Sequence, residues 1–265
     1  MTQKPLLQYL KQKQYWVNAL MTMFFVLYIN RMYSGGDMMK RKICFIFELL
    51  LKIATIIFAF WGVCLQARDD GGFIRSNTYL YFTIISNLET VAIVGVFIGL
   101  RIAETIRGKI ISKPLFVLKF MITAAMTITF TVAALLLAPF KDNAYLFSMK
   151  NLSLHIIAPI LMIIDFLLFD RYYEYKWRMT LVGFVLPLLY LAVTLLISVK
   201  GITYSNGTNF PYYFLNYREL GWFNLNGGMP GVAWWILIVA VMAFAVTYLL
   251  LAFKRAVMKI QGIKD

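Results

Sequence analysis

The sequence has few of the side chains that bind metals or form disulfides. Among its 265 residues are two cysteines, Cys44 and Cys64, and one histidine, His155. A zinc site takes about four Cys, His or acidic ligands, so we expect no metal centre, and no motif indicates another cofactor. The cysteines are 20 residues apart on one expected helix. That spacing corresponds to about 30 Å, far beyond the roughly 7 Å that a disulfide can bridge.

Charged residues are also scarce, at 14% of the chain, whereas 61% of the residues are hydrophobic. A typical globular domain has about 25% charged residues. The hydrophobic residues form six long runs, at roughly 44–66, 79–100, 115–138, 152–169, 179–199 and 229–253. A helix needs about 20 mostly apolar residues to cross a bilayer, and each run is near that length. The sequence therefore predicts an all-α, polytopic membrane protein, a bundle of six transmembrane helices.

The expected organisation has three segments. Residues 1–43 are a cytoplasmic or interfacial segment, residues 44–253 the six-helix membrane domain, and residues 254–265 a basic cytoplasmic tail. Residues 15–30 are apolar but short and follow several basic residues. We expect a helix lying in the cytoplasmic interface, with a short seventh span as the alternative.

Acidic residues are outnumbered by basic ones, 12 to 26, which gives a net charge of +14. No basic stripe with interleaved aromatics lies on a soluble segment, so we expect no nucleic-acid partner. Instead, eighteen Lys and Arg residues fall on one side of the expected spans and six on the other. Cytoplasmic connections carry such an excess. We therefore expect a multi-pass protein of the cell membrane with both termini in the cytoplasm.

The longest exterior connection, residues 200–228, is rich in Asn, Gly, Tyr and Phe. It is long enough to fold over the outer mouth of the bundle.

Five Asp, Glu or Lys residues lie inside the expected spans: Glu48, Lys52, Glu89, Lys119 and Asp165. Such residues are costly in lipid and normally pair with one another or mark a functional path. Lys119 and Asp165 lie at similar depth from the cytoplasmic side, in neighbouring spans. We interpret them as a structural ion pair, with a proton path as the alternative. Glu89 has no assigned partner.

The outer half of the bundle carries a second polar group. Thr83, Ser86 and Asn87 are spaced i, i+3, i+4 and share one helical face. His155 begins a later span that runs in the same direction, so Thr83 and His155 are both roughly 5–6 Å below the outer boundary. Pro159 follows four residues later and removes the hydrogen bond to the His155 carbonyl. We expect the helix to open at that point.

A neutral imidazole beside a hydroxyl is the minimal pair for nucleophilic catalysis. Thr83 and His155 are therefore candidate catalytic residues, and Asn87, Ser86 and Asn151 are candidates for orientation or oxyanion binding. Two structural explanations compete. Threonine in a membrane helix commonly bonds its own backbone, and a lone histidine often only joins two helices.

The stretch Tyr-Phe-Thr-Ile-Ile-Ser-Asn at 81–87, with His155-x-x-x-Pro159, resembles the androgen-induced and androgen-dependent membrane-protein family. The pattern looks most like its bacterial relatives with six spans and extends over nearly all of residues 44–253. The animal members are threonine hydrolases that cleave fatty-acid esters of hydroxy fatty acids. The resemblance implies Thr83 as nucleophile and His155 as base. The Ile-Ser-Asn that follows Thr83 is the bacterial form, so the animal substrate does not carry over.

We expect a threonine hydrolase acting on a fatty-acyl ester that comes from the surrounding membrane lipids. A lipid acyltransferase is one alternative. A transporter or channel with the ionisable residues along its path is another, although no repeated half supports it. A non-enzymatic scaffold is the third, and the sequence leaves the number of subunits open.

The basic asymmetry makes a testable prediction about topology. Single cysteines at positions 10 and 260, in a background without Cys44 and Cys64, should react with a membrane-impermeant maleimide only after the cell is opened. A cysteine at position 141 is the exterior control and should react in intact cells. Labelling of position 10 or 260 in intact cells would reverse the assigned orientation.

Overall fold

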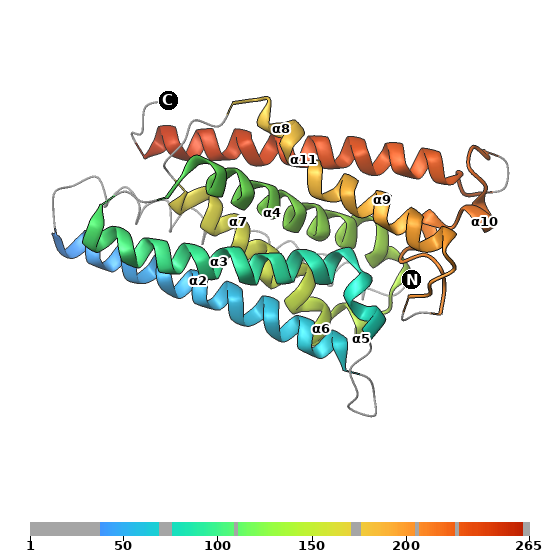
Figure 1. Ribbon diagram of the computed structural model, residues 1–265, viewed down its shortest axis with the longest axis horizontal. Coiled ribbons are helices and arrows are strands. Elements are labelled where there is room, and N and C mark those ends of the chain that lie inside the picture. Colours follow the sequence, from blue (N-terminus) through green and yellow to red (C-terminus); the bar gives the residue numbers. More distant parts are fainter. Residues whose placement is uncertain are drawn as a thin grey trace, which may run out of the picture.

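Figure 1 shows the computed structural model of the chain. The structure describes residues 38–68, 76–108, 111–170, 176–204, 207–225 and 228–261. Residues 15–30, and with them the expected interfacial or seventh helix, lie outside this part. Within it, 6 helices are long and apolar enough to cross a membrane, and they run side by side (Figure 1). The expected all-α polytopic bundle is confirmed.

Several spans consist of more than one helical segment. The first two are α2 (Met38–Ala67) and α3 (Phe82–Arg107). The third is α4 (Lys113–Val132), which continues as a π turn (Ala133–Leu137) and a 3-10 turn (Ala138–Phe140). The fourth is α6 (Met149–Leu152), a π turn (Ser153–Ile157) and α7 (Ala158–Phe169). The fifth is α8 (Met179–Val182) with α9 (Val185–Val199), and the sixth is α11 (Val232–Ile260). Short helical turns lie in the connections, at Ser76–Leu80, Asn143–Leu146 (α5), Tyr213–Leu215 and Tyr217–Leu220 (α10).

Three helices extend past the apolar runs at the end expected to be cytoplasmic. Helix α2 begins at Met38, α3 continues to Arg107, and α11 continues to Ile260. Most of the segment 254–265 that was expected as a tail is therefore helix. Its first residue, Lys254, is fully buried. The apolar run ends at residue 253, before the helix does, because charged side chains such as that of Lys254 can lie inside a bundle when partners surround them.

The two π turns have the same physical cause. Each ends two residues before a proline, Pro139 in one case and Pro159 in the other. Proline has no N–H to give to the carbonyl four residues back, and its ring clashes there. The chain widens by one residue, so that the amide of Ala158 donates to the carbonyl of Ser153 five residues earlier. The expected opening of the helix at His155 is present as this π turn.

Helices α2, α3, α4 and α7 form the centre of the bundle. Helix α2 packs against α3 and α7, and α4 packs against both α3 and α7. The most apolar stretch of the fourth span is 56% buried, against 17% for the fifth and 22% for the sixth. Helices α9 and α11 therefore lie at the periphery, on the side away from α2 (Figure 1). Both pack on α4.

The connection between α9 and α11, which the sequence predicts to lie outside the cell and which we call the exterior connection, is folded onto the bundle. Phe210, Phe214 and Leu215 are buried and pack with Val232 at the start of α11. Tyr204 is also buried, with its ring edge-on to Tyr81 at 5.3 Å between centroids. This connection covers the start of α3 and the end of the third span.

At the opposite end of the bundle, a buried cluster of charges joins the central helices. Asp165 of α7 accepts hydrogen bonds from Lys52 of α2 and from Lys119 of α4, the latter at 2.7 Å. Lys119 also contacts Asp170 at 2.7 Å, and Lys52 contacts Glu48 at 3.2 Å. The Lys119–Asp165 contact expected from the sequence is thus one link of a larger network.

Two further cations extend this network. Arg101 of α3 binds both carboxylate oxygens of Glu48, each at 2.9 Å, and Glu104 at 2.6 Å. Lys254 of α11 donates to the carbonyls of Phe166 and the next residue at the end of α7, at 3.0 and 2.9 Å. Four carboxylates and four cations therefore form a neutral set that joins α2, α3, α4, α7 and α11. Among the described residues Glu89 is not part of it, and its Oε2 is buried without a hydrogen bond.

The network makes a prediction about stability. Lys119→Met and Asp165→Asn should each lower the free energy of unfolding by about 3–5 kcal/mol, because each removes one charge from a buried network and leaves its opposite charge without full compensation. The double variant should lose less than the sum, with a coupling of about 1–3 kcal/mol. Lys113→Met, at an exposed position of the same helix, is the control. Denaturant unfolding in detergent gives the free energy of unfolding of the wild type and the four variants, and strictly additive losses would contradict the pairing.

Candidate functional site

Thr83 occupies the first turn of α3. The preceding Tyr81 is extended, with φ −82° and ψ 137°, and the helix begins at Phe82. The Thr83 side chain is nearly buried, at 8% exposure. The first turn of a helix is the positive end of its dipole, where negative charge is favoured. A charge developing on the Thr83 hydroxyl oxygen would therefore be stabilised by the 26-residue helix behind it.

His155 lies at the centre of the π turn in the fourth span. Its Nε2 is 3.3 Å from the hydroxyl oxygen of Thr83. The tautomer with its proton on Nδ1 leaves Nε2 as the acceptor for the hydroxyl proton. Nδ1 is buried without a hydrogen bond of ordinary geometry, and the backbone of Asn151 interacts with the imidazole. The sequence expected hydroxyl and imidazole at equal depth, and the structure brings the two into contact.

Gly62 of α2 holds the π turn in place from behind. A Cβ atom at Gly62 would lie 2.8 Å from Cγ of Leu154 and 3.1 Å from Cβ of Ser153. Only a residue without a side chain allows α2 to approach this closely. Leu154, directly before His155, is fully buried there. The position of the imidazole therefore depends on this contact between backbone and side chain.

The two polar residues that follow Thr83 bind its backbone. Asn87 donates from Nδ2 to the carbonyl of Thr83 at 2.7 Å and to that of Leu154 at 3.3 Å. Ser86 lies 3.1 Å from the same Thr83 carbonyl and 3.2 Å from the hydroxyl of Thr129. The side-chain amide of Asn87 thus links Thr83 to Leu154, the residue directly before His155. This geometry favours the orienting role over oxyanion binding.

The other sequence candidates lie apart from the Thr83 hydroxyl. Asn151 donates from Nδ2 to the carbonyl of Leu146 at 2.9 Å, which fixes the start of the fourth span. Lys119 and Asp165 belong to the charge network, and neither lines a cavity that contains Thr83. The site therefore consists of Thr83 and His155, with Asn87 bonding the backbone carbonyls of Thr83 and of Leu154, the residue before His155.

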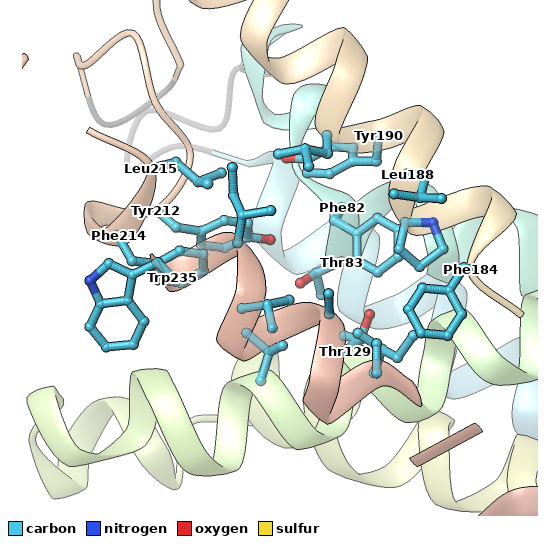
Figure 2. A pocket seen from close by; sticks show the side chains of 18 of the residues that line it. Phe82, Thr83, Thr129, Phe184, Leu188, Tyr190, Tyr212, Phe214, Leu215 and Trp235 are labelled. Atoms are coloured by element: carbon cyan, nitrogen blue, oxygen red, sulfur yellow. The ribbon is translucent and has the colours of Figure 1, made fainter. Parts of the chain in front are cut away.

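An apolar cavity of about 120 Å³ opens on one side of Thr83 (Figure 2). Its lining comes mainly from α3, α4, α9, α11 and the exterior connection, and includes Phe82, Phe184, Leu188, Phe214, Trp235 and Val239. No charged side chain is among the described residues that line it. A space with these properties favours a hydrocarbon chain over a polar solute.

This apolar cavity reaches the periphery between α9 and α11. The two helices meet where the rings of Phe184 and Phe244 are 6.1 Å apart. Leu188, one turn after Phe184, lines the cavity and is 56% exposed on the outer surface of the bundle. In a bilayer that surface faces lipid, so the cavity reaches the lipid-facing side of the bundle at Leu188.

A second, more polar cavity of about 460 Å³ opens on the other side of Thr83. Its polar lining comprises Gln66, Tyr81, Lys141, Tyr145, Tyr212 and Tyr213. Thr83, His155, Leu137 and Tyr212 line both cavities. The hydroxyl–imidazole contact therefore lies where an apolar space and a polar space meet.

Sequence reasoning did not find Tyr212, which lies beside Thr83. Figure 2 shows that its ring extends from the exterior connection toward Thr83, with the hydroxyl at the end nearer Thr83. Burial raises the pKa of Tyr212, and hydrogen bonds with the side chain and backbone of Thr83 oppose that rise. The many aromatic residues of 200–228 are consistent with a connection that folds over the bundle. No spacing rule, however, predicts a contact between residues as far apart in the chain as Thr83 and Tyr212.

Comparison of the chain with protein-family models, with curated proteins and with solved structures finds no match in any of the three.

The close approach at Gly62 makes a prediction about the site. Gly62→Ala should displace the π turn and lower the thermal midpoint, because overpacking a tight contact costs about 1–3 kcal/mol. Gly99→Ala is the matched control on a neighbouring helix, since a Cβ there meets nothing within 4 Å. It should be neutral or slightly stabilising, by about 0.5–1 kcal/mol, as alanine replaces glycine in a helix. Equal midpoints for the two variants would show that the π turn does not depend on Gly62.

Proposed function

We propose that this protein is a membrane-embedded hydrolase of fatty-acyl esters, with Thr83 as nucleophile and His155 as general base. The observation that carries the proposal is the 3.3 Å contact between the Thr83 hydroxyl and His155 Nε2 at the junction of the two cavities. An ester of a fatty acid has an apolar acyl chain on one side of its carbonyl and a more polar alcohol on the other. The two cavities match those two halves.

The reaction would proceed through an acyl-threonine. Thr83 Oγ1 attacks the ester carbonyl while its proton passes to His155 Nε2. The tetrahedral intermediate collapses, the bond to the alcohol oxygen breaks, and His155 returns the proton to that oxygen. Water then attacks the acyl-threonine, again with His155 as base, and releases the fatty acid. The resemblance to the androgen-induced and androgen-dependent membrane hydrolases supports the same two roles.

The proposed location is the outer half of the cell membrane, with both termini in the cytoplasm. The basic asymmetry of the connections supports this orientation. A lipid ester would then reach Thr83 sideways from the outer leaflet through the gap between α9 and α11. The alcohol would leave through the polar cavity, which the exterior connection covers.

Acyl transfer is the second candidate function, and the size of the polar cavity favours it. A volume of about 460 Å³ holds an acceptor alcohol as readily as it holds water. The acyl-threonine would be the same, and only the molecule that attacks it would differ. Adding glycerol or a long-chain alcohol to the assay distinguishes the two, because a transferase would form the new ester at the expense of free fatty acid.

The charged residues give a transport path no support. Glu48, Lys52, Lys119 and Asp165 are at most 2% exposed and are paired with one another. None of them lines either described cavity. Their arrangement matches a structural network that joins helices.

The proposed nucleophile can be tested by covalent labelling. A fluorophosphonate with a long alkyl chain should label the wild-type protein, and Thr83→Ala should lose the label because the attacking oxygen is gone. Thr90→Ala is the matched control: Thr90 is a buried threonine two turns further along α3, with its hydroxyl unbonded. It should label like the wild type. Undiminished labelling of Thr83→Ala, or a label mapped to another residue, would contradict the proposal.

A further inference from the structure

Tyr212 is held rigidly against the first turn of α3. Its ring stacks on Phe214, with centroids 5.3 Å apart and planes inclined by 6°. A second contact, edge-on, joins it to Tyr81 at 6.5 Å. The hydroxyl end points at Thr83 (Figure 2). Two aromatic neighbours therefore fix both the plane and the direction of this phenol.

The hydroxyl of Tyr212 interacts with the reacting residue itself. The side chain and the backbone of Thr83 both interact with the phenol of Tyr212. Burial raises the pKa of Tyr212 above its ordinary value, so the phenol keeps its proton throughout the physiological range. A protonated phenol beside the attacking oxygen is a hydrogen-bond donor aimed at the reaction centre.

Two polar side chains on the same face of α3, Asn87 and Ser86, are already engaged elsewhere. Asn87 gives its amide hydrogens to two backbone carbonyls, and Ser86 contacts the Thr83 carbonyl and the Thr129 hydroxyl. The ester carbonyl must lie close to the Thr83 hydroxyl when attack begins. Tyr212 lines both cavities, and its hydroxyl points toward Thr83, which also lines both.

We propose that Tyr212 is a third catalytic residue, whose phenolic O–H stabilises the oxyanion formed when Thr83 attacks the ester. This inference rests on the proposed hydrolase function. As Thr83 Oγ1 bonds to the carbonyl carbon, the electron pair of the C=O bond moves onto the carbonyl oxygen, which accepts a hydrogen bond from Tyr212. When the intermediate collapses, that pair reforms the C=O bond and the bond to the leaving oxygen breaks. Tyr212 retains its proton in both steps, while His155 carries the transferred proton.

The test compares two tyrosines of the same connection. Tyr212→Phe removes one oxygen and keeps the stacked ring. Tyr204→Phe is the matched control: Tyr204 is 2% exposed, also lies edge-on to Tyr81, and bonds Thr194 rather than Thr83. The full-length protein in detergent is assayed with p-nitrophenyl esters of long-chain fatty acids, and thermal midpoints are measured in parallel.

Tyr212→Phe should lower kcat about 100-fold, since loss of one oxyanion donor has that order of effect. Its KM should stay within about threefold of wild type, because the donor acts on the transition state and not on the bound ester. Thermal midpoints should match, and Tyr204→Phe should keep wild-type kinetics. A purely structural role would instead lower the midpoint and affect both tyrosine variants alike.

Some results would contradict only the role of Tyr212, and others would contradict the hydrolase function itself. If Thr83→Ala is inactive while Tyr212→Phe keeps its kcat, the role of Tyr212 is wrong and the hydrolase proposal stands. A raised KM with unchanged kcat overturns the role as well, because the phenol would then only bind the ester. If the wild type neither cleaves the esters nor takes the fluorophosphonate at Thr83, the proposed function fails and the inference fails with it.

A second substitution covers the case in which Tyr212→Phe does not fold. Difluorotyrosine incorporated at position 212 keeps the shape and the hydroxyl but ionises at lower pH. The rate should then fall with rising pH as this phenol loses its proton, a limb that the wild type lacks. A pH profile identical to that of the wild type would overturn the inference.

Discussion

The pairing of Asp165 with Lys52 and Lys119 is the interaction on which the arrangement of the central helices depends. In a bilayer core no water is present to solvate an isolated charge, so each buried ion must find its partner inside the protein. Asp165 lies on α7, the most buried helix, and its two lysines come from α2 and α4. Through Glu48 and Arg101 the same network reaches α3. Because one carboxylate ties three helices together, their rotation and relative depth are fixed at this end of the bundle.

At the end of the bundle that contains Thr83 and His155, the structure depends on proline and glycine and not on charges. There the spans are opened by proline, and each opening is a π turn that changes the direction of the side chains that follow. The turn in the fourth span directs His155 toward the start of α3, while Gly62 allows α2 to support it from behind. The charged network fixes the helices at one end of the bundle. The opposite end is less regular and contains the two cavities.

The position of the candidate site follows from this division. Helix α9 carries none of the residues named in the charge network, α11 carries only Lys254, and both helices pack on α4, so a gap between them costs the bundle little packing. The apolar cavity occupies that gap, and the polar cavity lies under the exterior connection. Thr83 lies between them because α3 begins at Phe82, which brings the positive end of its dipole to the boundary. A hydroxyl at this point has apolar space, polar space and a base within reach.

The sequence by itself determined the class of the protein and much of its local structure. Six apolar runs of membrane-spanning length predicted the six helices, and Pro159 predicted where the fourth span opens, because both depend on chain length and backbone bonding alone. Helical spacing also brought Thr83, Ser86 and Asn87 to one face. Only the tertiary structure decided that Arg101 and Lys254 join the charge network, that Gly62 contacts Leu154, and that Tyr212 reaches Thr83. These contacts join residues far apart in the chain, and they depend on how helices rotate and cross, which no local period encodes.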